Sequence, residues 1–454
     1  NSLGAAAENL IREIPVDELN DGDVLITNDP WMSAGHFFDI TILTPIFRFD
    51  RLIGFCGSTI HHTDIGGYGI GAGARDIHEE GLWIPVLKLY DKGELNETLA
   101  KIIETNVRTP KAIFGDLGAQ VASGKTGAER LNAMCDRYGI DEIELLSNEI
   151  ISRSETSTRE AIKKLTGGTF VGDCTFDVPG GEVIKLVTSV TIDNENGSVE
   201  IDFAGSSPPS SSGINVVMAY THAYSTFAVK SIINPELPNN AGSLAPIEVV
   251  APDSCIINAK YPVPVNARHV VGMYVPFPIL NALSQVVPEK VVAEGSGAVW
   301  TFQIQGRGAD GDYFTSSMFN YSGGMGARAT KNGLSATCYP TGVSAVPIEV
   351  LEASIPIEFT TKELVIGSGG QGRFKGGDGQ RIGFKMNTDS RWFLNAIPSR
   401  LNIPAQGLRG GRPGATGSFL INGEPLLEAK KREMLPADEV LMQTPGGGGF
   451  GSAR

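Results

Sequence analysis

Two short histidine–aspartate clusters near the start of the sequence are its strongest candidates for chemistry. In the first cluster His36 precedes Asp39 by three positions, and in the second His61 precedes Asp64 by the same spacing. Neutral imidazole and carboxylate groups are common ligands of zinc, manganese and iron. The clusters therefore predict a divalent metal site that activates water or polarises a carbonyl group. Ordinary hydrogen bonding in turns is the alternative interpretation, and it would suffice for one histidine alone.

The two clusters flank a predicted β-hairpin. Residues 40–49 and 52–60 are apolar or alternate in polarity, with a polar break near residue 50, which is typical of paired strands. Antiparallel pairing would bring the two clusters side by side. His62 follows His61 directly, and adjacent side chains on a strand point to opposite faces. Only one of these two histidines is expected to bind the metal directly, which leaves the other for acid–base catalysis or for orienting a ligand.

Further polar groups follow the second cluster. Glu80 lies in a polar run at residues 76–81, just before an apolar segment. A solvated loop and a role beside the substrate or the metal are equally compatible with this run. Arg108 and Asp116 could fix an anionic group, since arginine pairs well with carboxylate and phosphate. A structural salt bridge is the preferred interpretation of Arg108.

The wider pattern predicts a mixed N-terminal region followed by a larger strand-rich region. Apolar residues at helical spacing predict helices at residues 3–13, 97–105, 117–137 and 141–165. After a pair of glycines at 167 and 168 most segments resemble strands, interrupted by helical stretches near 215–233 and 275–287. We therefore expect an α+β, multi-domain, strand-rich protein. A mixed α/β metal-binding catalytic domain would span residues 1–167, and a β-rich region with two apolar helices would span 168–454.

Composition narrows the possible partners and compartments. The 454 residues carry a formal net charge of −14, which argues against nucleic acid or an anionic membrane surface as the main partner. No apolar run reaches the roughly 18–20 residues that span a bilayer. The five cysteines are odd in number and far apart, so neither a disulfide framework nor a thiolate zinc site is expected. A cytoplasmic location fits these features.

Glycine is unusually frequent and clustered. There are 56 glycines, about 12% against an average near 7%. Residues 367–372 match the pattern GxGxxG and residues 446–449 are consecutive glycines, but no helical pattern follows the first. A phosphate-binding loop needs that helix. Glycine-rich turns or interface loops are therefore preferred over nucleotide binding, and we expect no cofactor-binding residues in these loops.

Several motifs together resemble the hydantoinase B family. The resemblance is carried by the residues Asn28-Asp29-Pro30-Trp31, Gly35-His36, Asp39, Thr44-Pro45, His61-His62-Thr63-Asp64-Ile65-Gly66-Gly67, Glu80-Gly81-Leu82, Asn106-Val107-Arg108, Gly115-Asp116-Leu117 and the glycines at 446–449. It covers essentially the whole chain. This family includes the B-type subunits of ATP-dependent N-methylhydantoinase and 5-oxoprolinase, and related subunits of acetone and acetophenone carboxylases.

The resemblance implies a division of labour between two subunits. A hydantoinase A-type partner would bind ATP and Mg²⁺ and phosphorylate the substrate oxygen, and the B-type subunit would complete the reaction at a divalent metal. Matched residue by residue, the resemblance implies His36, Asp39 and His61 as metal ligands or neighbours of the metal, and Asp64 as a ligand or as a base beside the ligands. Together with the strand alternation and the polar run at residues 76–81, this leads us to expect His62, Asp64 and Glu80 as the catalytic residues. It also implies a further N-terminal stretch with acidic residues, which could supply another carboxylate ligand.

Three functions follow as expectations. The first is the metal-bearing subunit of an ATP-dependent cyclic-amide hydrolase, acting on a small-molecule substrate of the hydantoin, oxoproline or lactam type within a hetero-oligomer. The second is a subunit of an ATP-dependent ketone carboxylase. The third is a non-catalytic scaffold subunit whose glycine loops dock partners. Bicarbonate dependence distinguishes the first two, and stoichiometric metal distinguishes both from the third.

Overall fold

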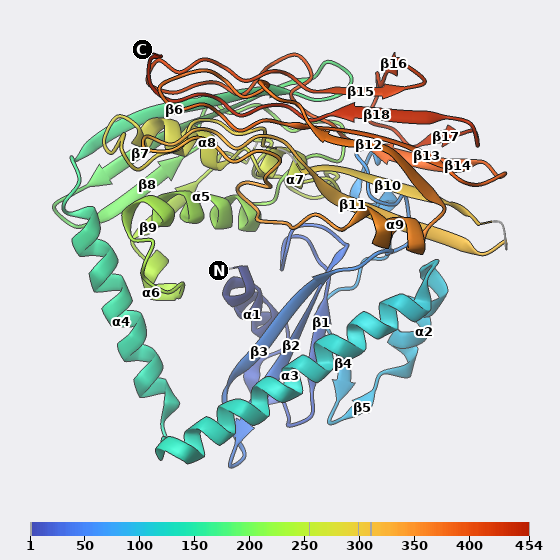
Figure 1. Cartoon of the computed structure of the whole chain (residues 1–454). Coiled ribbons are helices and arrows are strands. Elements are labelled where there is room, and N and C mark those ends of the chain that lie inside the picture. Colours follow the sequence, from blue (N-terminus) through green and yellow to red (C-terminus); the bar gives the residue numbers. More distant parts are fainter. Residues whose placement is uncertain (1, 254, 298, 309–310, 454) are drawn as a thin grey trace.

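The computed structural model describes residues 2–253, 255–297, 299–308 and 311–453 (Figure 1). Its N-terminal part begins with the helix α1 (Ser2–Glu13) and the short helix η1 (Val16–Glu18). A five-stranded antiparallel sheet follows, in the order β3-β2-β1-β4-β5. Its strands are β1 (Val24–Thr27), β2 (Asp39–Arg48), β3 (Arg51–His61), β4 (Leu87–Asp91) and β5 (Glu94–Leu95).

The predicted hairpin is confirmed as β2 and β3. Its two-residue turn places Phe49 and Asp50 at positive φ, 50° and 59°, the backbone that a tight hairpin turn needs. The register pairs Asp39 with His61 across the two strands. The ends that carry the two polar clusters therefore lie together, and the chain returns through η2 (Ile77–Glu79) before β4 begins.

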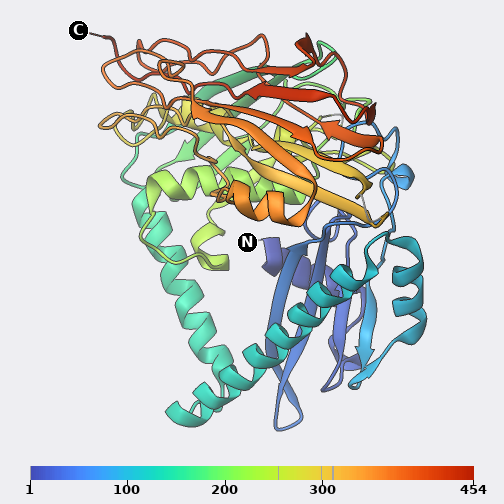
Figure 2. The ribbon, with the colours of Figure 1, turned by 45° about the vertical axis from the view of Figure 1, so that its right-hand side comes forward.

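Three helices follow this sheet. They are α2 (Glu97–Asn106), α3 (Pro110–Tyr138) and α4 (Ile143–Ile162). α3 begins seven residues before the predicted 117 because Pro110 can start a helix at its first turn. It runs across the sheet (Figure 1), where a Cβ on Gly124 would lie 2.2 Å from the Thr44 side chain. α4 then leads away from the sheet towards the rest of the molecule (Figure 2).

The middle of the chain forms a second sheet with apolar helices against it. The strand order is β6-β7-β8-β9, from β6 (Gly168–Asp177), β7 (Val183–Asp193), β8 (Ser198–Asp202) and β9 (Ile247–Val250). The helices are α5 (Met218–Ile233), α6 (Ala241–Leu244), α7 (His269–Gly272) and α8 (Pro276–Leu283). Buried apolar side chains of β6, β7, α5 and α8 belong to one core, so the helices predicted near 215–233 and 275–287 are confirmed with shorter bounds.

The C-terminal part contains two sheets that share a core. One has the order β11-β10-β14-β17, from β10 (Val299–Arg307), β11 (Tyr313–Ser322), β14 (Trp392–Ala396) and β17 (Arg432–Met434). The other has the order β12-β13-β18-β15-β16, from β12 (Ile357–Leu364), β13 (Gln380–Met386), β15 (Ser418–Ile421), β16 (Glu424–Pro425) and β18 (Glu439–Gln443). α9 (Ile348–Ser354) precedes β12. Trp300, Phe302 and Phe384 come from both sheets and are buried together, as in a β-sandwich.

The glycine clusters pack against one another as extended segments. Extended segments from 323–326, 368–377, 405–414 and 445–450 bind one another through backbone hydrogen bonds, for example from the Gly370 amide to the Gly447 carbonyl at 2.8 Å and from the Gly447 amide to the Gly377 carbonyl at 3.0 Å. A Cβ on Gly377 would lie 1.9 Å from the Leu334 carbonyl oxygen. Only glycine allows backbones to approach so closely.

The mixed α and β architecture with several sheets confirms the predicted fold class. The division at residue 167 stays a prediction, and contacts cross it: the Trp31 indole donates to the Ala259 carbonyl at 2.9 Å. Among the residues that the structure describes, no helix is both long enough and apolar enough to cross a membrane.

Candidate functional site

The β2–β3 hairpin brings the first cluster against His61. Asp39 begins β2 and lies opposite His61, the last residue of β3. The rings of His36 and His61 have centroids 5.1 Å apart, and Phe38 stacks on His61 at 5.3 Å. The hairpin thus assembles His36, Asp39 and His61 from a sequence separation of 25 residues, as the strand pairing predicted.

Two hydrogen-bond acceptors face each other in this group. His36 is buried, and its Nδ1 lies 2.8 Å from the carbonyl oxygen of Asn266. Because a carbonyl can only accept, Nδ1 donates. Burial and then the nearby Arg268 charge lower the pKa of His36, so its Nε2 keeps a lone pair. That Nε2 lies 3.3 Å from Oδ2 of Asp39, an arrangement that a cation between the two atoms would stabilise.

Arg268 supplies the positive charge that Asp39 contacts. Its Nη2 donates to Oδ2 of Asp39, and its Nε donates to the Ala34 carbonyl at 2.7 Å. The guanidinium lies 4.8 Å from the centroid of the Tyr220 ring. The arginine side chain is 9% exposed and that of Asp39 is 13% exposed, so water screens this pair weakly.

Burial and the Arg268 charge keep the surrounding imidazoles neutral. Desolvation, followed by the repulsion that a protonated His36 would exert, lowers the pKa of His61 to about 3. Desolvation and then Arg268 lower the pKa of His269 well below its usual value. Burial opposes ionisation of Asp39, but attraction to His36 when that imidazole is protonated and to the Arg268 charge outweighs burial and lowers the pKa of the carboxyl. The site therefore presents one carboxylate, one guanidinium and neutral imidazoles.

A cavity of about 400 Å³ opens onto these groups. We call it the site cavity, and it is lined by His36, His61, Tyr220, Tyr224, Arg268, His269, Met273, Val299, Thr341 and Val343. The aromatic residues come from α5, whereas Arg268 and His269 lie at the start of α7. A cavity of this size suits a small molecule.

His62 points away from the site cavity, as the strand alternation predicted. It is fully buried, with Nε2 3.4 Å from Oε1 of Gln120 and Nδ1 3.9 Å from the carboxylate of Asp116. Both partners come from α3. Desolvation lowers the pKa of His62. The structure thus ties His62 to the helix behind the hairpin, and its assignment as a catalytic residue stays a prediction.

Asp64 is held apart from His36 and His61 by a salt bridge. Its carboxylate accepts a hydrogen bond from the Arg108 guanidinium at 2.7 Å and another from the Arg108 backbone amide. The Gly66 amide donates to it at 3.1 Å. This arrangement agrees with the structural interpretation of Arg108, and it leaves Asp64 outside the residues that line the site cavity.

Glu80 is connected to the site through a loop. It is 1% exposed, and its Oε1 accepts from the backbone amides of Val265 and Asn266, both at 2.7 Å. Asn266 is the residue whose carbonyl binds His36. Desolvation raises the pKa of Glu80 well above its usual value, against the lowering effect of the two amides. Glu80 therefore fixes the loop that orients His36 and does not line the cavity itself.

The donor set suits a divalent metal, but the side chains as placed do not form a complete site. Within the described ranges, no three His, Cys, Asp or Glu side chains converge closely enough to hold an ion. Across those same ranges, Nε2 of His36 and Nε2 of His269 are buried without a hydrogen-bond partner. Unpaired buried nitrogens of this kind are costly and suit metal ligation. Metal binding accordingly stays a prediction.

Comparison with known proteins places the chain in a family. The family model described as hydantoinase B/oxoprolinase matches residues 1–453. The chain belongs to the hydantoinase B/oxoprolinase family. The resemblance that the sequence motifs carry is thereby confirmed over the whole chain.

Relatives of this family member include both uncharacterized and named proteins. An uncharacterized protein of Methanocaldococcus jannaschii is 33% identical over 447 residues, which are 96% of this chain and 77% of that protein. The B-type subunit of a putative D-/L-hydantoinase from a Pseudomonas species is 29% identical, over 97% of this chain and 78% of that protein. The beta subunit of the caprolactamase of Pseudomonas jessenii is 27% identical, over 96% of this chain and 78% of that protein.

Solved structures show the same fold. The ATP-dependent caprolactamase of Pseudomonas jessenii superposes with a TM-score of 0.88 at 24% identity, over 99% of this chain and 81% of the other. A nucleotide-free acetone carboxylase superposes with a TM-score of 0.86 at 20% identity, over 99% of this chain and 67% of the other.

Sequence reasoning missed half of this hydantoinase B site. Arg268, His269 and Asn266 come from one short loop about 230 positions after the first cluster, and Tyr220 and Tyr224 come from α5. The run Asn266-Ala267-Arg268-His269 places three polar side chains just before an apolar helix. That run of polar residues is the one sequence feature that could have marked this loop as functional, but it does not indicate that the loop contacts the hairpin.

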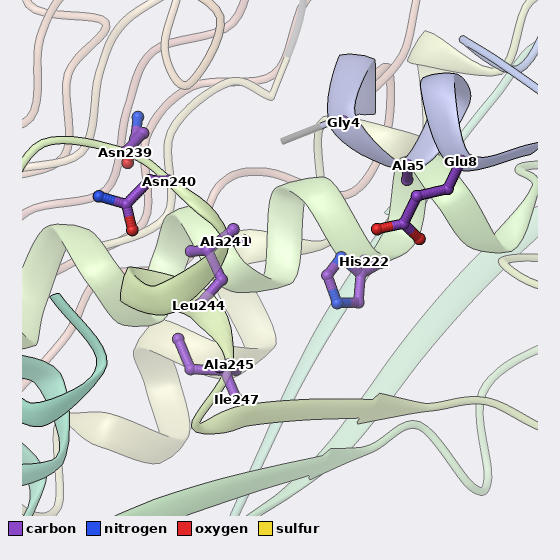
Figure 3. A pocket seen from close by; sticks show the side chains of 10 residues that line it. All are labelled: Gly4, Ala5, Glu8, His222, Asn239, Asn240, Ala241, Leu244, Ala245 and Ile247. Atoms are coloured by element: carbon purple, nitrogen blue, oxygen red, sulfur yellow. The ribbon is translucent and has the colours of Figure 1, made fainter. Parts of the chain in front are cut away.

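A second cavity, of about 530 Å³, is lined in part by His222 of α5 (Figure 3). It is lined by residues of α1, α5 and α6, including Glu8 and His222, and by Asn240 just before α6. His222 is two positions from both Tyr220 and Tyr224, so it points to the opposite side of α5. None of the residues predicted for the site lines this cavity, and α5 separates it from the site cavity.

Proposed function

We propose that this chain is the metal-bearing subunit of an ATP-dependent cyclic-amide hydrolase, which completes the hydrolysis of a substrate phosphorylated by a hydantoinase A-type partner. The observation that carries the proposal is the pair of opposed acceptors, Nε2 of His36 and Oδ2 of Asp39, which lie 3.3 Å apart where His36 lines a small-molecule cavity. A divalent cation held by these two residues and His61 would resolve that opposition. Zinc, manganese and iron all suit this donor set.

Each residue of the site has a role in this proposal. The Asn266 carbonyl fixes the His36 tautomer, and Glu80 fixes the Asn266 loop through two backbone amides. A bound divalent metal would supply a nucleophilic hydroxide at neutral pH. Phosphorylation of the amide oxygen by the partner would create a good leaving group. The cavity walls would keep bulk water from the activated substrate.

The relatives favour hydrolysis over carboxylation. Proteins named as the B-type part of a hydantoinase and as the beta part of a caprolactamase resemble the chain over nearly its full length. Their names also support a partner subunit for this chain. The likeness to acetone carboxylase, at 20% identity, concerns the fold. Ketone carboxylation is therefore the alternative outcome of the test.

The test uses the complex that the protein forms with its native partner. We expect the purified complex to contain stoichiometric divalent metal and to hydrolyse a lactam or hydantoin with ATP. His36→Ala and His61→Ala should each abolish both properties. His78→Ala is the matched control, because His78 is exposed and bonds to Tyr261 outside the site cavity.

Three results would contradict the proposal in different ways. Full metal content and turnover in both His36→Ala and His61→Ala would remove the metal assignment. Turnover that requires bicarbonate and a ketone would assign the chain to the carboxylases. A wild-type complex without stoichiometric metal would favour the scaffold interpretation.

A further inference from the structure

We propose that Arg268 binds an oxyanion of the substrate while Tyr220 and Tyr224 hold its ring or hydrocarbon part. The substrate class is then a compact, mostly apolar molecule with one phosphoryl or carboxylate group. This inference rests on the proposed function for the identity of the site, and it adds a binding residue and an orientation that the metal hypothesis does not contain.

The guanidinium is fixed in place before any ligand arrives. Its Nε donates to the Ala34 carbonyl at 2.7 Å, its Nη2 donates to Asp39, and its Cζ lies over the Tyr220 ring, 4.8 Å from the ring centroid. A guanidinium carries five N–H donors, and these bonds use two of its three nitrogens. The side chain also lines the site cavity. A pre-oriented planar donor of this kind binds phosphate or carboxylate with little loss of side-chain entropy.

The rest of the cavity lining is aromatic and aliphatic, and it begins at Tyr220, which contacts Arg268. Tyr220 and Tyr224 are stacked, with ring centroids 4.6 Å apart and planes 9° from parallel. Met273 and Val299 belong to a small apolar cluster, and the Thr341 hydroxyl lies 3.6 Å from the sulfur of Met273. All five residues line the cavity. These walls offer aromatic and aliphatic contacts to a ring, whereas the charged groups gather around His36 and Arg268.

The charges in the cavity predict how anion binding depends on metal. The charges of Arg268 and Asp39 cancel each other in their ion pair. An oxyanion therefore meets a site of nearly zero net charge in the metal-free protein. A divalent cation held at His36 and Asp39 would make the site positive. We expect anion affinity to rise when the metal is added.

The experiment is calorimetric titration of the chelator-treated wild-type complex, with and without added Mn²⁺ or Zn²⁺. The probes are phenylphosphonate, inorganic phosphate, benzoate and the neutral benzamide. Arg268→Gln should weaken phenylphosphonate binding at least about tenfold, because a charge-assisted hydrogen bond contributes about 1.5–3 kcal/mol. Arg268→Lys should weaken it less, since the charge remains but the planar donor is lost. Arg391→Gln is the control, since Arg391 is exposed and directly precedes β14, and it should leave the affinity for phenylphosphonate unchanged.

A second pair of variants tests the apolar side. Tyr224→Leu should weaken phenylphosphonate but leave inorganic phosphate unchanged, because only the former has a ring. Tyr224→Phe should bind both probes like the wild type. Tighter binding of phenylphosphonate than of benzoate supports a phosphorylated substrate, and the reverse order supports a substrate with its own carboxylate.

Two outcomes would overturn the inference. One is unchanged phenylphosphonate affinity in both Arg268 variants, and the other is benzamide binding as tight as that of the anions. If Arg268→Gln does not fold, Arg268→Lys together with Tyr224→Leu and Tyr224→Phe still tests the inference. The proposed function fails separately: anion binding that depends on Arg268, in a complex that turns over no lactam, would refute the hydrolase and leave this inference standing.

Discussion

The ion pair between Asp39 and Arg268 gives the sharpest test of the site's architecture. It joins residues 229 positions apart, and both side chains are nearly buried. When Asp39 is replaced by Asn, Arg268 keeps its bond to Ala34 and its contact with Tyr220. The guanidinium therefore cannot swing into water and remains an uncompensated buried charge.

The magnitude follows from that confinement. Removing one partner of a buried pair typically costs about 3–5 kcal/mol, so Asp39→Asn and Arg268→Gln should each approach this loss in the free energy of unfolding. The double variant buries no unpaired charge. Its free energy of unfolding should therefore exceed the value expected from adding the two single losses, and the difference, the coupling energy between Asp39 and Arg268, should be about 1–3 kcal/mol. The surface pair Arg391 and Glu433, with side chains 64% and 49% exposed, should show a coupling of about 0–1 kcal/mol in the same cycle.

The assay is urea unfolding of chelator-treated protein, followed by circular dichroism and tryptophan fluorescence. Coincident transitions from the two probes are required before free energies are compared. Additive losses in the Asp39 and Arg268 variants, within about 0.5 kcal/mol, would refute the pairing on which the electrostatics of the site depend.

Two further predictions concern the glycine segments and the supporting loop. Gly377→Ala should destabilise the protein by about 1–3 kcal/mol or more in urea unfolding, because its Cβ would lie 1.9 Å from the Leu334 carbonyl oxygen. The control is Gly118→Ala in α3, which should be neutral or stabilising because nothing lies within 4 Å of its Cβ. Equal losses of stability in the two variants would contradict the close packing at Gly377. The raised pKa of Glu80 means that the folded state favours the protonated carboxyl. The contribution of Glu80 to the free energy of unfolding is therefore complete below about pH 4.5 and is lost as the pH rises through the raised pKa. Glu80→Gln should therefore gain stability relative to the wild type as the pH rises above about 4.5, and a pH-independent difference between the two proteins would refute this assignment.

Local sequence pattern determined the hairpin and the orientation of its histidines. Strand alternation has a period of two, so the positions of His61 and His62 on opposite faces follow from their adjacency alone. Antiparallel pairing likewise brings the ends of β2 and β3 together, which places Asp39 beside His61. The metal ligands implied by the family resemblance therefore lie where local geometry predicts, although their ligation stays a prediction.

Only the tertiary structure decided what faces those histidines. Asp64 repeats the spacing of Asp39, yet it lies against Arg108, because the chain turns away after His61. Arg268 reaches Asp39 from the start of α7, and no periodicity in the sequence links positions 229 residues apart. The glycine clusters show the same limit: glycine marks a place of close approach, but which backbone approaches depends on how distant segments pack.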